Sequence, residues 1–144
     1  MPSDPSHLEN LERARQLNAE PPDRQELANL LRSAERLLRD ARNPDLSPES
    51  SFSLAYGAAH SLALAALRAA GYRPSSSGHR RILFQVLEVT ALAPRQLWLA
   101  LAQYHDRRNK IEYAGSVPSG TEAKDLIKLT EELKALVEKR LKRA

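Results

Sequence analysis

The stretch SPESSFSLAYGAAHSLALAALRAAG, residues 47–71, decides the fold. Ser47 followed by Pro48 is typical of a helix start, because the serine side chain caps the helix and proline suits its first position. Apart from Arg68, the central and final turns of this stretch carry no charged residue. A helix that is apolar on nearly all sides belongs at the centre of a bundle. Gly71 is suited to the position just after its end.

Amphipathic helical patterns flank this stretch on both sides. Apolar residues at intervals of three and four predict further helices over residues 7–18, 23–41, 79–92, 95–113 and 121–141. The connections between them are short, so consecutive helices should pack antiparallel. We therefore expect an all-α fold: an up-and-down bundle of four to five helices over residues 23–144, with an extra short helix in an N-terminal extension, residues 1–22. Residues 72–78 are predicted to form a polar loop.

The composition excludes several classes of function. The chain of 144 residues has no cysteine, which excludes disulfides, thiolate zinc sites and a cysteine nucleophile. Its first residues lack the features of a signal peptide, and its longest apolar run, residues 62–67, is far below the ~20 residues of a membrane-spanning helix. No glycine-rich phosphate loop, zinc-binding histidine pair or nucleophile elbow occurs in it. We expect a soluble cytoplasmic protein with no metal, no cofactor and no membrane association.

Positive charge is concentrated in one part of the chain. The net charge is +4, but residues 68–110 contain eight basic and two acidic residues, a difference of +6, which leaves −2 for the remainder. One interpretation is an ordinary solvated face. The other is a binding site for phosphate, because arginine can donate paired hydrogen bonds to phosphate oxygens.

The run YHDRRNKIEY, which ends at Tyr113, contains the densest set of polar residues. Residues four apart share one face of a helix, which places Arg108 above Glu112 and His105 in line with Asn109. Both stripes continue apolar rows of the same helix, so these side chains should be partly buried and hydrogen-bonded. They form either a functional surface or a polar network that fastens this helix to the central one.

The remaining histidines give weaker signals. His60 lies in the apolar central helix, where we interpret it as a hydrogen-bonded core residue; it or Tyr56 would be the anchor of the polar network. His79 stands beside Arg80 at the start of a helix, where backbone N–H groups attract anions, so it marks a capping loop or a phosphate cradle. His7 lies near the terminus, and we assign it no role.

The segment DRRNKIEY, residues 106–113, resembles the signature helix of HEPN domains, which are small all-α proteins. The upstream segments SLAYGAAH, residues 53–60, and AGYRP, residues 70–74, are also similar to that family, as is the Gly-His pair at residues 78–79. The resemblance covers about residues 30–141. It implies a bundle that forms a homodimer, with the signature helices meeting at the two-fold axis. Many members are metal-independent ribonucleases, often the toxin beside a minimal nucleotidyltransferase antitoxin.

The ribonuclease motif of the HEPN family consists of an arginine, a polar residue and a histidine further along the helix. Arg108 matches the arginine and Asn109 the polar residue, whereas Tyr113 stands where the histidine is expected; starting from Arg107 leads to Tyr113 or Glu112. In the family the arginine contacts the scissile phosphate and the histidine acts in the acid–base step. Tyrosine is a poor base near neutral pH because its ordinary pKa is ~10.

The resemblance and the missing histidine leave two main functional hypotheses. The first is a dimeric binding module that engages RNA, a nucleotide or a partner protein through a basic face and has no standard nuclease activity. That face consists of Arg107, Arg108, Asn109 and Glu112. The second is a divergent metal-independent ribonuclease or toxin of a HEPN–nucleotidyltransferase pair. Its candidate catalytic residues are Arg108, Tyr113 and His105. A third hypothesis is purely structural association through the alanine-rich central helix.

Overall fold

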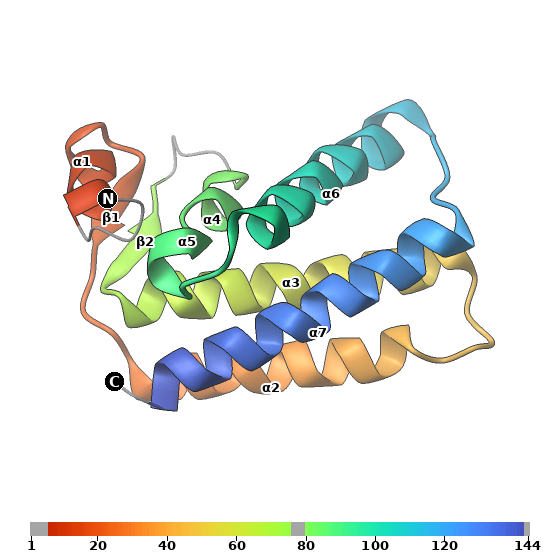
Figure 1. The fold of residues 1–144 in the computed structure, drawn as a ribbon, viewed down its shortest axis with the longest axis horizontal. Helices are drawn as coiled ribbons and strands as arrows, with labels where there is room; N and C mark the ends of the chain where they lie inside the picture. The colour runs from red at the N-terminus through yellow and green to blue at the C-terminus, as the bar shows by residue number, and fades with distance from the viewer. Residues whose placement is uncertain (1–5, 76–79, 143–144) are drawn as a thin grey trace.

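The computed structural model describes residues 6–75 and 80–142, and it confirms the predicted all-α bundle (Figure 1). A small two-stranded sheet accompanies the helices. In chain order the elements are α1 (Ser6–Arg13), β1 (Leu17–Ala19), α2 (Arg24–Ala41), α3 (Pro48–Ala69), β2 (Tyr72–Pro74), α4 (Ile82–Gln85), α5 (Leu87–Thr90), α6 (Arg95–Ala114) and α7 (Gly120–Lys142). Within the described part of the chain, no helix is both long and apolar enough to cross a membrane.

Helix α3 lies at the centre of the bundle, as its composition predicts. The Ser47 side chain accepts a hydrogen bond from the Ser50 backbone N–H, and Pro48 occupies the first turn. At the other end Gly71 adopts a left-handed backbone, with φ of 93°, a conformation that glycine adopts without strain. The buried alanines of α3 let neighbouring helices approach closely. A Cβ added to Gly57 would stand 3.3 Å from the Leu37 side chain of α2.

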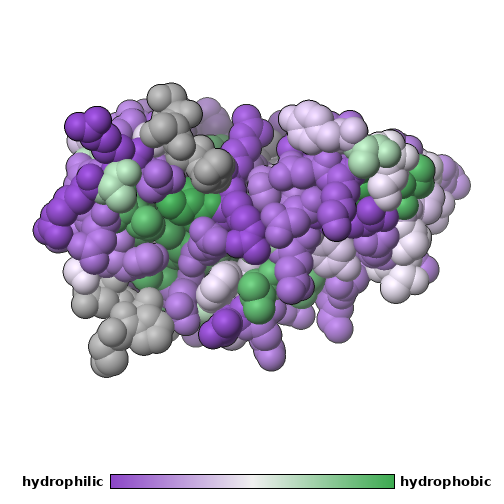
Figure 2. Space-filling view, turned by 90° about the horizontal axis from the view of Figure 1, so that it is seen from above, coloured by the Kyte–Doolittle hydropathy of each residue, from purple (hydrophilic) through white to green (hydrophobic). Residues whose placement is uncertain are grey.

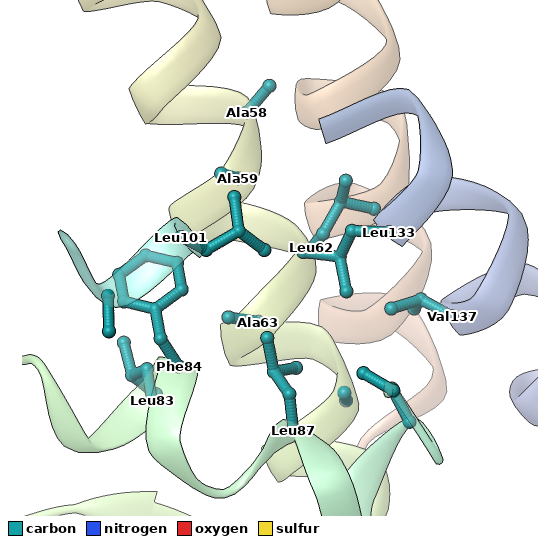
Figure 3. Close-up of a cluster of buried hydrophobic side chains, with 14 of the residues drawn as sticks. Ala58, Ala59, Leu62, Ala63, Leu83, Phe84, Leu87, Leu101, Leu133 and Val137 are labelled. Carbon is teal, nitrogen blue, oxygen red and sulfur yellow. The ribbon is translucent and has the colours of Figure 1, made fainter. Parts of the chain in front are cut away.

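The core forms where α3 meets the other elements. Figure 3 shows small and large side chains from α3, α4, α5, α6 and α7 pointing toward one another. The labelled residues are Ala58, Ala59, Leu62, Ala63, Leu83, Phe84, Leu87, Leu101, Leu133 and Val137. Helices α2 and α7 run along most of α3, whereas α6 rises away from α3 toward its C-terminal end (Figure 1). The polar end of α6 is therefore less covered than its apolar beginning.

The first predicted helix is too long, because α1 ends at Arg13 and not at residue 18. Arg15 adopts a left-handed backbone, with φ of 63°, which stops the helix. The chain then forms β1, which pairs antiparallel with β2; Leu17 lies opposite Pro74 and is fully buried. The predicted polar loop after α3 is wrong for the three residues of β2. Its partner is more than fifty residues away, so no local pattern reveals it.

The helix predicted over residues 79–92 is also wrong as a single element. It consists of the short helices α4 and α5, which meet at Val86. Six of the eight residues from Ile82 to Val89 are buried, and one straight helix cannot turn so many consecutive side chains to one core. The break at Val86 lets both short helices face α3. His79, expected in this helix, lies outside the described residues.

The buried Arg68 connects the N-terminal segment to the bundle. It is only 1% exposed, and its guanidinium donates hydrogen bonds to the Glu26 carboxylate at 2.7 Å and to the carbonyls of Glu20 at 3.0 Å and Pro21 at 2.8 Å. Arg73 binds the carboxylates of Glu20 and Glu26 from the other side. The expected boundary at residue 22 lies directly beside these contacts, and the division into extension and bundle stays a prediction.

Candidate functional site

The two adjacent arginines of α6 point to different parts of the molecule. The Arg107 guanidinium donates hydrogen bonds to the Glu122 carboxylate at 2.8 Å, the Ser116 hydroxyl at 2.6 Å and the Val117 carbonyl at 3.0 Å. Successive residues are about 100° apart around a helix, so Arg108 faces elsewhere. Arg107 is thus engaged in fastening the end of α6 to the start of α7.

Arg108 lies above the aromatic ring of Tyr56 on α3. The guanidinium carbon is 4.7 Å from the ring centroid, a distance typical of a cation–π interaction. The one carboxylate paired with it in the described residues is that of Glu112, at 3.6 Å, which is too long for a strong hydrogen bond. About a third of the Arg108 side chain remains exposed, so a ligand in solvent can reach it.

Beneath Arg108, α3 and α6 are joined by a polar contact. The Tyr56 hydroxyl and His105 Nδ1 share a buried hydrogen bond of 2.8 Å. The Phe84 ring of α4 lies against both side chains, with ring centroids about 6 Å away. Burial raises the pKa of Tyr56 and lowers that of His105, so both groups are neutral near pH 7. The polar network expected between α6 and the central helix is therefore present, with Tyr56 as its anchor.

His60 lies in the same cluster, and nearby positive charges act on its ring. Its ring lies 6.3 Å from that of Tyr56, one turn earlier on α3. Burial lowers the pKa of His60 to about 4, with further lowering by the positive charges of Arg80 and Arg108 and by His105. The two arginines therefore add positive charge around this ring, and burial is the larger cause of the lowered pKa.

The other predicted site residues lie at the edge of this cluster or away from it. Asn109 is partly buried on α6, and Glu112 is exposed beside Arg108. Tyr113 is 84% exposed, and within the described residues no hydrogen bond or ring contact involves it. Tyr104, at the start of the polar run, donates a hydrogen bond to the Asp125 carboxylate at 2.7 Å. Most of the surface seen over α6 is hydrophilic (Figure 2).

Half of the eight basic residues in the positive segment are closely paired with carboxylates. Those with an ion pair shorter than 3.2 Å are Arg68, Arg73, Arg81 and Arg107. Arg80 is exposed and has no ion-pair partner in the part of the chain that the structure describes. Of the basic residues of this segment without a close ion pair, Arg80 and Arg108 both act on His60, whereas Arg95 and Lys110 are exposed elsewhere on α6.

The sequence placed Arg80 beside His79 at a possible phosphate cradle and not with the residues of α6. Arg80 lies in the connection before α4, and its charge acts on Tyr56 and His60 of α3 and on His105 of α6. The sequence contained one sign that a polar cluster lies against the central helix. Tyr56 and His60, one turn apart, are polar residues in an otherwise apolar helix. Within residues 6–75 and 80–142, no cluster of three or more metal-ligating side chains occurs.

Comparison with known proteins matched no family model, no curated protein and no solved structure. The resemblance to HEPN domains therefore rests on the sequence segments alone.

Proposed function

We propose that this protein is a HEPN-like helical module that binds RNA through its phosphates. In this proposal the phosphate contacts are made by Arg108 and Arg80, with Asn109 beside them on α6. The observation that carries the proposal is the placement of the Arg108 guanidinium, which lies 4.7 Å above the Tyr56 ring, is about one-third exposed and has its carboxylate partner only at 3.6 Å. A bound phosphate would accept hydrogen bonds from the exposed part of Arg108.

The weak pairing of Arg108 with Glu112 also supports phosphate binding. At 3.6 Å the two groups attract one another without a close hydrogen bond, and both side chains are partly exposed. Exposed pairs of this kind contribute only ~0–1 kcal/mol, so a phosphate can displace the carboxylate at small cost. The cation–π contact with Tyr56 would then hold the guanidinium in place.

We further propose that the protein acts as a homodimer in which the C-terminal ends of two α6 helices meet. Tyr113 and Val117, at and just after this end, are 84% and 64% exposed and would supply apolar contacts at that interface. Light scattering tests this proposal: a dimer has twice the 16.1 kDa mass of the chain, and Tyr113→Glu should halve the measured mass. A parent protein with the mass of one chain would refute it.

RNA binding is tested by fluorescence anisotropy with a labelled single-stranded RNA in the presence of EDTA. Arg108→Ala should weaken binding about tenfold, because a hydrogen bond to a charged group contributes ~1.5–3 kcal/mol. The matched control is Arg36→Ala, which removes an exposed arginine from α2. Two phosphate contacts predict a slope of about −1.4 for the logarithm of affinity against that of salt concentration. Equal losses of RNA affinity in Arg108→Ala and Arg36→Ala would refute this binding site.

The alternative function is that of a divergent metal-independent ribonuclease, and the Tyr56–His105 hydrogen bond is the observation that favours it. The Tyr56 ring that lies under the Arg108 guanidinium is hydrogen-bonded to a histidine, although the motif position holds Tyr113. In this alternative the partner is a minimal nucleotidyltransferase that acts as antitoxin. RNA cleavage in EDTA that Arg108→Ala and His105→Ala both abolish would establish the enzyme. If the parent protein binds the RNA but leaves it intact, the binding module is the function and the ribonuclease is refuted.

A further inference from the structure

A cleft of about 230 Å³ lies where α2 ends and where α3 and α7 begin. Figure 1 shows the beginnings of α3 and α7 at the same end of the bundle. Most of the residues that line the cleft are apolar, among them Leu46, Pro48, Ala123 and Ile127. A mostly apolar lining with a few polar groups is typical of sites for small organic ligands.

The charged side chains that line this cleft favour an anion. They are Arg42 and Lys124, and no carboxylate is among the lining residues that the structure describes. Arg42 is already paired with Glu131 at 2.8 Å, whereas Lys124 is exposed and has no ion-pair partner in residues 6–75 and 80–142. Asp45 and Glu49 are nearby in the chain, but both are exposed and neither borders the cleft. One unpaired positive charge suits a ligand with a single negative charge.

The starts of two long helices add to this positive character. Pro48 at the beginning of α3 and Gly120 at the beginning of α7 both border the cleft. The first N–H groups of a helix have no partner within it, and each N-terminus carries a partial positive charge of about half a unit. The Glu122 carboxylate in the first turn of α7 is engaged by Arg107 at 2.8 Å and by the Ser119 backbone N–H at 3.0 Å. Two such helix starts beside one cleft favour an anion over a cation of the same size.

The buried Ser51 of α3 is independent evidence for a ligand in this cleft. It is only 8% exposed, and it borders the cleft. The hydroxyls of Ser47 and Ser50 bond to each other at 3.1 Å, whereas no hydrogen bond involves the Ser51 hydroxyl within the described part of the chain. Among the side-chain polar atoms described, only Trp98 Nε1 is enclosed without a partner, so the Ser51 hydroxyl stays open to the cleft. Because buried polar groups are costly without a partner, a ligand oxygen that accepts its hydrogen bond would be stabilised here.

We propose that this cleft binds a small carboxylate with a short apolar body. The carboxylate accepts a hydrogen bond from the Ser51 hydroxyl and lies near the Lys124 ammonium group, at the positive ends of α3 and α7. The apolar body lies against Leu46, Ala123 and Ile127. The cleft shares no residue with the proposed RNA site, so its test is independent of RNA binding.

Three ligands of equal length separate the contributions of charge and apolar area. Pentanoate, pentanol and pentylammonium are titrated separately into the full chain, and the backbone amide signals of residues 46–51 and 120–124 are followed by NMR. We expect saturable shifts with the highest affinity for pentanoate, a lower affinity for pentanol and the lowest for pentylammonium. Binding of pentanol or pentylammonium at least as tight as that of pentanoate would overturn the proposal. The absence of saturable shifts with pentanoate would overturn it as well.

Two variants locate the binding. Ser51→Ala removes no existing hydrogen bond and places a good helix former in α3, so the fold is preserved, and pentanoate binding should weaken roughly threefold to tenfold. Lys124→Gln should weaken pentanoate binding roughly twofold to fivefold and leave pentanol binding unchanged, as for an exposed ion pair. Lys139→Gln removes another exposed charge near the far end of α7; it is the matched control and should change neither affinity. Unchanged pentanoate affinity in Ser51→Ala, or equal losses in Lys124→Gln and Lys139→Gln, would refute the assignment.

Discussion

Replacing Arg68 with methionine tests the contact that joins the N-terminal segment to the bundle. The substitution keeps an unbranched side chain of similar length but removes the guanidinium. Four hydrogen bonds are lost, one to the Glu26 carboxylate and three to the carbonyls of Glu20, Pro21 and Tyr72. These acceptors lie where α2, β2 and the segment before α2 meet, so Arg68 is their common donor.

The expected loss of stability in Arg68→Met follows from the burial of the ion pair between Arg68 and Glu26. Removing one partner of a buried ion pair costs ~3–5 kcal/mol. The side chains of Glu20 and Glu26 are 48% and 28% exposed and both keep Arg73, which favours the lower value. We therefore expect Arg68→Met to lower the free energy of unfolding by ~3 kcal/mol and Tm by about 10 °C. Arg73→Met, with a more exposed side chain, should cost only ~1 kcal/mol.

The stability lost in Arg68→Met should also depend on pH in a defined direction. Hydrogen bonds from Arg73 and Arg68 lower the pKa of Glu26, and Arg73 lowers that of Glu20. A carboxyl whose pKa is lowered in the folded state adds stability above its unfolded pKa of ~4.3, and this stability is lost as the pH falls through the folded pKa. The difference between the parent and Arg68→Met should therefore shrink from about pH 7 to about pH 3.

Urea unfolding followed by far-UV circular dichroism measures both effects. A loss below ~1 kcal/mol at neutral pH would show that the acceptors find other partners and that Arg68 is not their essential donor. A loss of the same size at both pH values would show that the carboxylates contribute nothing to it. Either result would refute the reasoning.

Three further predictions concern α6. Tyr56→Phe leaves Nδ1 of the buried His105 without its partner and should lower the free energy of unfolding by ~1–2 kcal/mol in urea; unchanged stability would contradict the hydrogen bond. Arg108→Ala removes a positive charge near His60 and should raise the pKa of His60 from about 4 toward its ordinary value, as followed by NMR of its ring; an unchanged pKa would contradict the proximity. Arg107→Ala should destabilise the fold by ~1–2 kcal/mol and weaken RNA binding less than Arg108→Ala does; the reverse order would exchange their roles.

The central helix could be predicted from the sequence because its signals are local. Ser47, Pro48 and Gly71 mark its ends within one turn, and its composition alone requires burial. The sheet could not be predicted, because β1 and β2 are short, lack an alternating pattern and depend on each other across the chain. The donors of Arg68 lie at the same junction, where they bind the carbonyls of the chain that leads from β1 to α2.

The candidate site was predicted in part. The pattern placed polar residues of α6 against the central helix, and Tyr56 and His105 meet there. It could not distinguish Arg107 from Arg108, because the two side chains are about 100° apart around the helix and the apolar pattern does not fix which of them faces the central helix. Only the positions of Glu122 and Tyr56 decide which arginine is engaged in the fold and which faces the cluster.

The contrast between Arg68 and Arg108 shows why net charge is a poor guide to the binding surface. Both are arginines of the positive segment, but Arg68 is enclosed, and four protein acceptors satisfy its donors. An anion could reach it only by breaking the junction that it holds together. Arg108 rests on an aromatic ring, faces a carboxylate at 3.6 Å and keeps a third of its surface in solvent. Since a ligand needs donors that the protein leaves free, the phosphate site that we propose lies at Arg108 and Arg80, and the charge count of the whole segment does not locate it.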